Sequence, residues 1–301
     1  MDLWIPVTIA AAFFQNLRNM LQKSLKGRLS TWGATATRFV YAAPLALILF
    51  AALTADRGGA PAAPGLFFLA GAAGGIAQIL ATGILISMFA KTNYAVATAF
   101  TKTEPLQTAL FGAVLLGEGI SKGALAGILV SIFGVVLVSV PAGQENGRLR
   151  IDANVWRGIL SGGLFGLSAV AYRAASLSLP SGHVLLRAAA TLAFVTCFQA
   201  ILISAWLALR EPGEMRRVLA AWRVAAGVGV SGMLGSLAWF TAFTLENAAH
   251  VRSLGQVEVI FTLIASILFF REQVTWREGI GVLLVAAGVV VLVLLRHPAA
   301  G

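Results

Sequence analysis

Long apolar stretches separated by short polar breaks dominate this sequence and restrict what it can fold into. A helix needs about 20 apolar residues to cross a hydrocarbon core of ~30 Å. Ten stretches reach that length, at 3–22, 32–54, 66–90, 93–117, 120–141, 154–178, 182–208, 222–246, 247–271 and 275–296. Because lipid offers the backbone no hydrogen-bond partners, helices are the plausible structure for such stretches. The sequence therefore predicts an all-α membrane protein with ten transmembrane helices.

The composition supports this class and excludes several others. Charged residues make up 11% of the chain and apolar residues 58%, whereas soluble domains carry about 25% charged residues. The net charge of +10 comes from Lys and Arg in the gaps between apolar stretches, so it indicates topology and no nucleic-acid partner. A single cysteine, Cys197, excludes a disulfide scaffold. The sequence contains no zinc-protease or nucleotide-binding motif, and we expect no metal or cofactor.

An internal repeat relates the segment 89–136 to the segment 243–290, 154 residues later. The matches fall on polar residues and glycines, which pair as Asn93 with Asn247, Glu104 with Glu258, Glu118 with Glu272, Gly127 with Gly281 and Gly134 with Gly288. A unit with an odd number of crossings must be inverted when it is repeated in tandem. We therefore predict two inverted five-helix repeats, residues 1–146 and 147–301, with a working site near the midplane where they meet.

Positive charge is distributed unevenly between the two ends of the predicted helices. Thirteen Lys and Arg residues lie in the loops that follow the odd-numbered helices, whereas the other side carries Arg57, Lys122 and Arg296. Because cytoplasmic loops are enriched in Lys and Arg, we expect the first set of loops to face the cytoplasm. This predicts a multi-pass protein of the inner (plasma) membrane with both termini in the periplasm.

Two carboxylates, Glu104 and Glu258, lie eleven residues into their predicted helices, close to the bilayer midplane. A charge there costs at least ~2.5–3.5 kcal/mol, so it faces a cavity or a partner. They are candidates for the substrate pathway and for proton coupling, and the alternative is that they lock neighbouring helices together by hydrogen bonds. Glu118 and Glu272 end their helices, where capping or ion pairing is expected.

Other polar and aromatic residues inside the predicted helices complete the candidate pathway. They are Asn16, Asn19, Gln78, Thr101, Ser168, Tyr172, Trp239 and His250. Asn16 and Asn19 belong to an amide stripe on the first helix. His250 has a structural role as its alternative. Five arginines lie near helix ends and are predicted to reach the headgroups by snorkelling: Arg18, Arg38, Arg173, Arg187 and Arg252.

The motif TEPLQTALFGAVLLGE at 103–118 resembles the repeat signature of the EamA branch of the drug/metabolite transporter superfamily. Its second copy at 257–272 is similar, but it has Val259 where that family usually has proline and Arg271 where it has glycine. The resemblance implies a ten-helix exporter of amino acids, other metabolites or drugs. The two departures caution against assuming that both halves contribute equally.

The function predicted from these features is secondary transport, without enzymatic activity, that exports amino acids by alternating access across a bacterial inner membrane. Aromatic amino acids are included because the overall pattern is most similar to the aromatic amino acid exporter branch, and Trp239, Phe240 and Phe243 cluster on one predicted helix. The alternatives are export of other metabolites or drugs, a passive channel, and an intramembrane enzyme. The expected partners are a small-molecule substrate and the lipid bilayer, with a monomer as the working assumption.

Overall fold

A computed structural model of the chain describes residues 2–25, 27–55, 59–89, 101, 103–139, 153–261, 263–264 and 276–295. Within these ranges the regular elements are all helices, which confirms the all-α prediction. They are α1 (Trp4–Leu25), α2 (Thr31–Ala55), α3 (Gly65–Phe89), α5 (Glu104–Leu116), α6 (Lys122–Ser139), α7 (Ala153–Ser178), α8 (Val184–Arg210), α9 (Glu214–Ala220), α10 (Trp222–Leu245), α11 (Ala248–Leu254), the 3-10 turn η1 (Gly255–Val257) and α13 (Trp276–Leu295).

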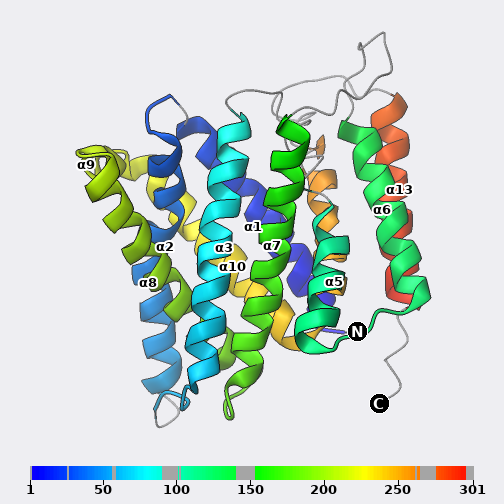
Figure 1. Cartoon of the computed structure of the whole chain (residues 1–301), viewed down its shortest axis with the longest axis horizontal. Coiled ribbons are helices and arrows are strands. Elements are labelled where there is room, and N and C mark those ends of the chain that lie inside the picture. The colour runs from blue at the N-terminus through cyan, green and yellow to red at the C-terminus, as the bar shows by residue number, and fades with distance from the viewer. Residues whose placement is uncertain are drawn as a thin grey trace.

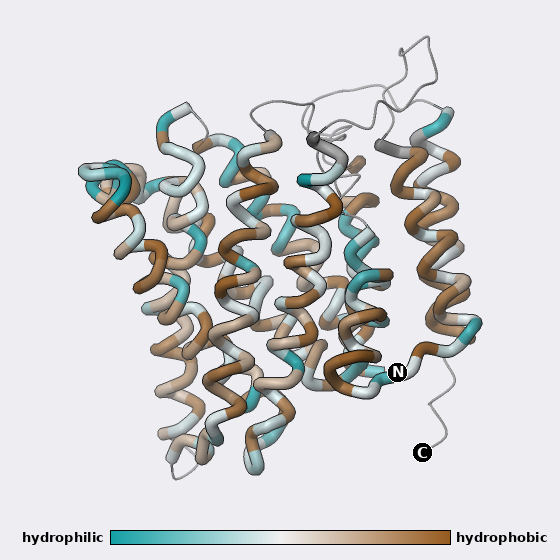
Figure 2. Tube along the Cα trace, viewed as in Figure 1, coloured by the Kyte–Doolittle hydropathy of each residue, from teal (hydrophilic) through white to brown (hydrophobic). Residues whose placement is uncertain are grey.

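The long helices stand side by side, with their ends gathered at two opposite ends of the molecule (Figure 1). α1 begins and α13 finishes at the lower end of this view, whereas α7 begins at the upper end and runs downward. Figure 2 shows that α6 and α13 are hydrophobic along nearly their whole length, while hydrophilic residues interrupt α5. The bundle thus combines two largely apolar helices, α6 and α13, with the more polar helix α5.

Four of the described helices, α2, α3, α8 and α10, are long and apolar enough to cross a membrane. α1 and α7 are of similar length but more polar, because they carry side chains that are buried inside the protein, such as Asn16 and Ser168. The predicted helix 247–271 is interrupted, since α11 ends at Leu254 and η1 follows it. Asn93 and Glu272 lie outside the described residues. Ten membrane spans therefore remain a prediction.

The helices pair across the two halves of the sequence in a symmetric pattern. α3 packs against α7, and the pair obtained by exchanging the halves, α10 and α1, also packs together. α2 packs against α8 and α6 against α13, so each of these helices contacts its own counterpart. Because α7 runs opposite to α1 (Figure 1), this is the pairing expected of related halves in opposite orientations.

Glycines that the sequence repeat relates bring α6 and α13 together. A Cβ atom on Gly127 would lie 2.7 Å from the carbonyl oxygen of Gly288, and a Cβ on Gly134 would lie 2.6 Å from that of Gly281. Small residues let two helix backbones approach this closely. Each glycine therefore packs against the repeat counterpart of the other.

The centre of this contact is formed by Ser131 and Val285. The Ser131 hydroxyl donates a hydrogen bond to the carbonyl oxygen of Val285 at 3.4 Å, and the two residues are 154 positions apart. This separation is the repeat interval itself. The two helices therefore cross at the point where each residue meets its own repeat counterpart.

Replacing Gly134 by alanine is expected to lower the thermal unfolding temperature, because the new Cβ would push α6 away from α13. Gly279 on α13 is the matched control, since a Cβ there meets no atom within 4 Å. Gly279→Ala should leave the unfolding temperature unchanged or raise it, because alanine favours helix by about 1 kcal/mol over glycine. Differential scanning fluorimetry in detergent measures both. A Gly134→Ala variant as stable as Gly279→Ala would contradict the close glycine contact.

Candidate functional site

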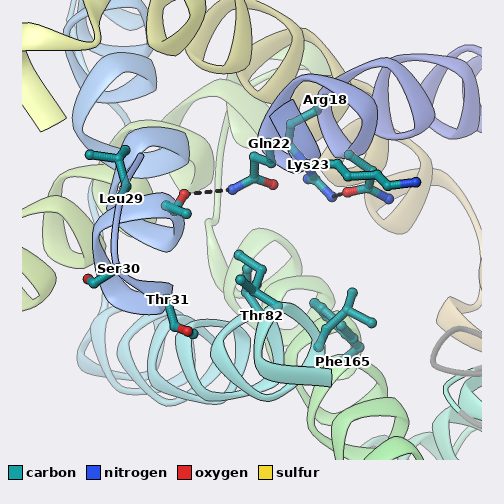
Figure 3. Close-up of a pocket in the computed structure, with 12 residues that line it drawn as sticks. Arg18, Gln22, Lys23, Leu29, Ser30, Thr31, Thr82 and Phe165 are labelled. Atoms are coloured by element: carbon teal, nitrogen blue, oxygen red, sulfur yellow. Dashed lines mark hydrogen bonds between the residues drawn. The ribbon is translucent and has the colours of Figure 1, made fainter. Parts of the chain in front are cut away.

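Three cavities share lining residues, and we call their combined lining the central tract. The first cavity has a volume of about 110 Å³ and lies where α1 ends and α2 begins (Figure 3). Its lining includes Gln22 and Lys23 of α1, Thr31 of α2, Thr82 of α3 and Phe165 of α7. The first cavity is therefore at the upper end of the bundle in Figure 1, where α3 finishes and α7 begins.

Two smaller cavities continue the tract. The second cavity, of about 10 Å³, shares Phe165 with the first. The third, of about 20 Å³, shares Gln15, Trp239 and Arg252 with the second. Because neighbouring cavities have residues in common, the tract extends from the end of α1 to the region of η1. Of the predicted pathway residues, the tract contains Asn19, Gln78, Glu104, Tyr172, Trp239 and Glu258.

Glu258 follows η1 and is 6% exposed. Its carboxylate accepts hydrogen bonds from the Gln15 amide nitrogen at 2.8 Å and the Asn19 amide nitrogen at 3.1 Å. Gln15 and Asn19 are one helical turn apart, so both reach the same partner. The amide oxygen of Gln15 accepts from the Trp239 indole at 3.0 Å, and that of Asn19 accepts from Arg18 at 2.9 Å. Glu258 therefore both joins helices and lines a cavity, so the two alternatives raised by the sequence are compatible.

Glu104, the repeat counterpart of Glu258, has a different partner. It is the first residue of α5, and the Pro105 that follows suits the first turn of a helix. Its Oε1 lies 2.8 Å from Nε of Arg252 on α11. The Arg252 guanidinium also lies 4.5 Å from the ring centroid of Trp239 and 5.1 Å from that of Phe243, distances typical of cation–π contacts. This ion pair connects α5 and α11 beside the third cavity.

A neutral hydrogen-bonded cluster contributes two residues, Gln78 and Tyr172, to the lining of the second cavity. The Tyr172 hydroxyl lies 3.1 Å from Oε1 of Gln78, which also accepts from Nε2 of Gln199 at 3.0 Å. The Tyr172 ring packs against Phe240 with 4.5 Å between centroids. These contacts fix the positions of α3, α7, α8 and α10 around the cavity.

The other four predicted pathway residues are buried but do not line these three cavities. They are Asn16, Thr101, Ser168 and His250. The Ser168 hydroxyl donates to the carbonyl oxygen of Phe165 at 2.7 Å, and Nδ1 of His250 lies 3.2 Å from Oε1 of Glu246. The Ser168 hydroxyl is therefore bonded within its own helix. The contact of His250 with Glu246 agrees with the structural role that the sequence indicated as the alternative for His250.

Arg173 of α7 holds the end of the bundle opposite to the first cavity. Its Nε lies 2.6 Å from Oε1 of Glu118, and its Nη1 donates to the carbonyl oxygens of Phe243 and Glu246 at 2.5 and 2.7 Å. The predicted ion pairing of Glu118 is thus confirmed. The contact joins α7 to the α5–α6 connection and to the end of α10, where carbonyl groups need partners.

The sequence-based placement of arginines at the headgroups is wrong for Arg18, Arg38 and Arg252. They are 5%, 4% and 7% exposed and line the central tract. Proximity to a helix end suggested snorkelling, but interhelical contacts decide where these side chains lie. A signal was present for Arg18, because it lies three residues after Gln15 and four residues before Gln22, and residues at this spacing share one helix face with these amides.

Comparison with known proteins agrees with this architecture. Two relatives from Helicobacter pylori strains, each described as an uncharacterized transporter, are 35% identical over 83 and 69 residues. These matches cover 28% and 23% of this chain and 26% and 23% of the relatives, so the chain spans about a quarter of their length. A crystal structure with 19% identity matches 97% of this chain and 98% of its own with a TM-score of 0.71, which shows a shared fold.

The family comparison covers both halves of the chain. The EamA-like transporter family matches residues 2–140 and again residues 155–294. Transporters of this kind are embedded in membranes, in agreement with the apolar helices of the bundle. The chain therefore belongs to the EamA-like transporter family.

Proposed function

We propose that this protein is a secondary transporter that exports amino acids, including aromatic ones, across the bacterial inner membrane by alternating access. The observation that carries the proposal is the central tract, which combines a few polar groups with the aromatic rings of Phe165, Trp239, Phe240 and Phe243. Aromatic walls with a small number of placed polar groups suit a planar zwitterionic solute.

The proposed organisation is two inverted five-helix halves, residues 1–146 and 147–301, in a monomer with both termini in the periplasm. The first cavity lies beside Lys23, at the end of α1 that the distribution of Lys and Arg assigns to the cytoplasm. In this orientation the first cavity faces the compartment from which an exporter takes its solute. Arg173 then holds the periplasmic end together.

Reconstituted protein is expected to give saturable flux of labelled Phe, Trp or Tyr across liposome membranes. The physical reason is that the tract offers both aromatic surface and hydrogen-bonding groups to such solutes. Empty liposomes and the parent protein inactivated by heat are the controls. Saturable flux of sugars or cationic dyes with no flux of any amino acid would contradict the substrate assignment and leave the transporter family unaffected.

Glu258 and Glu104 are proposed to act in transport, with either one able to carry a coupling proton. Glu258→Gln is expected to reduce flux at least about tenfold, because a neutral amide can no longer accept two charge-assisted hydrogen bonds from Gln15 and Asn19. Glu104→Gln should reduce it as well, since Arg252 then lacks its counter-charge.

Flux with and without a pH gradient distinguishes coupling from a structural role. A variant that keeps its flux but no longer responds to the gradient identifies the proton carrier. Unfolding temperatures of both variants, measured in detergent, control for loss of structure. If both variants fold and transport as the parent does, these carboxylates have no role in transport.

A further inference from the structure

Charge is unevenly distributed along the central tract. The described lining of the first and second cavities contains no carboxylate and four cations, Arg18, Lys23, Arg38 and Arg252, of which Arg252 also lines the third cavity and pairs there with Glu104. The two carboxylates of the tract, Glu104 and Glu258, line the third cavity. A solute that enters from the first cavity therefore meets positive side chains first. Such a lining attracts anions and disfavours cations.

Arg38 is the unusual member of this group. It lies in α2, is 4% exposed and lines the second cavity. In the part of the chain that the structure describes, its guanidinium has no hydrogen bond or ion pair, and it lies 5.2 Å from the centroid of the neighbouring Phe39 ring. Arg187 lies near the start of α8, the counterpart of α2, but it donates to two backbone carbonyl oxygens at the end of α7. Buried guanidinium groups are normally paired, and among the described residues no carboxylate pairs with Arg38.

Neighbouring cations increase this imbalance. A Cβ on Gly232 of α10 would lie 3.5 Å from Cδ of Arg18 and 3.6 Å from Cγ of Arg38, so both side chains cross the same glycine. Arg18 lies across the same glycine as Arg38, and Arg252 lines the same cavity, so like charges are brought close together in a low-dielectric interior. In a low-dielectric interior an incoming anion relieves such repulsion and gains charge-assisted hydrogen bonds.

The second cavity also determines what kind of anion fits. Besides Arg38, its lining includes the polar residue Gln78 and the aromatic residues Tyr172 and Phe240. A carboxylate with an apolar or aromatic body matches this lining. The volume of about 10 Å³ has room for about one water molecule. A solute therefore reaches Arg38 only when the surrounding helices separate, as alternating access requires.

We propose that Arg38 binds the carboxylate of the transported solute in the second cavity, and that the cationic lining selects solutes with a carboxylate over cationic solutes. The inference rests on the proposed transport function and specifies the charge of its substrate. It leaves two sources of that carboxylate, a zwitterionic amino acid and a simple organic acid. A planar guanidinium can bind a carboxylate through two parallel hydrogen bonds, which a lysine cannot reproduce.

Isothermal titration calorimetry of the full-length protein in detergent tests this inference without requiring flux. The probes are L-phenylalanine, 3-phenylpropanoate, which lacks the amine, and 2-phenylethylamine, which lacks the carboxylate. We expect the parent to bind 3-phenylpropanoate at least about tenfold more tightly than 2-phenylethylamine. Arg38→Gln should weaken 3-phenylpropanoate binding by about ten- to a hundredfold, the range for a hydrogen-bonded charge pair.

Two further variants separate recognition from folding. Arg38→Lys should give intermediate affinity, because it keeps the charge but loses the two parallel hydrogen bonds. Arg187→Gln, the matched control, should leave the ratio of the two probe affinities unchanged. A parent that binds no carboxylate probe, or that prefers 2-phenylethylamine, overturns the inference whatever the variants do. Equal 3-phenylpropanoate affinity of parent and Arg38→Gln also overturns it.

The probes also separate this inference from the proposed function. Binding of 3-phenylpropanoate through Arg38 without any binding or flux of L-phenylalanine would support the Arg38 site and contradict amino acid export. Flux of L-phenylalanine that is unaffected in Arg38→Gln would support amino acid export and contradict the Arg38 site. If the parent binds L-phenylalanine and 3-phenylpropanoate and Arg38→Gln binds neither, the result supports the Arg38 site and amino acid export together.

Discussion

The hydrogen bonds from Gln15 and Asn19 to the buried Glu258 carboxylate are the contact on which the central tract depends. An ionised group deep in a bilayer costs at least ~2.5–3.5 kcal/mol without partners, and α1 supplies two donors from one face. The same requirement explains why α1 is more polar than α2 or α3. Gln15 also connects the first half of the chain to the second, because its amide oxygen accepts a hydrogen bond from the Trp239 indole of α10.

A symmetric scaffold here carries an asymmetric site. Gly127 and Ser131 of α6 pack against α13 symmetrically, at positions related by the sequence repeat. Glu104 and Glu258, which the repeat also relates, have different partners. The sequence explains the difference, because the position 154 residues before Arg252 is Thr98. The first copy therefore carries no cation at the repeat position equivalent to Arg252, and the Glu104–Arg252 ion pair has no repeat-related counterpart. The divergence from the family pattern at Val259 gave the same warning that the halves are not equivalent.

Much of the fold could be predicted because lipid allows so few backbone structures. The predicted stretches 32–54 and 222–246 correspond to α2 and α10 within one residue at each end. The interruption of the predicted helix 247–271 was missed. Apolar content does not reveal the close contact between Gly255 and the Trp239 ring, from which a Cβ on Gly255 would lie 2.4 Å. The buried arginines were missed for a related reason. Whether Arg38 reaches the headgroups or the interior depends on tertiary packing, which no local pattern reports.

The most direct test asks whether the central tract is open to one side of the membrane and occupied by substrate. Thr82 lines the first cavity and is 4% exposed, so Thr82→Cys in a Cys197→Ala background places one small thiol there. An impermeant maleimide should label it in inverted membrane vesicles, in which the cytoplasmic face is outward, and substrate should slow the labelling. Labelling from the periplasmic face alone, or labelling that no transported solute affects, would contradict the account.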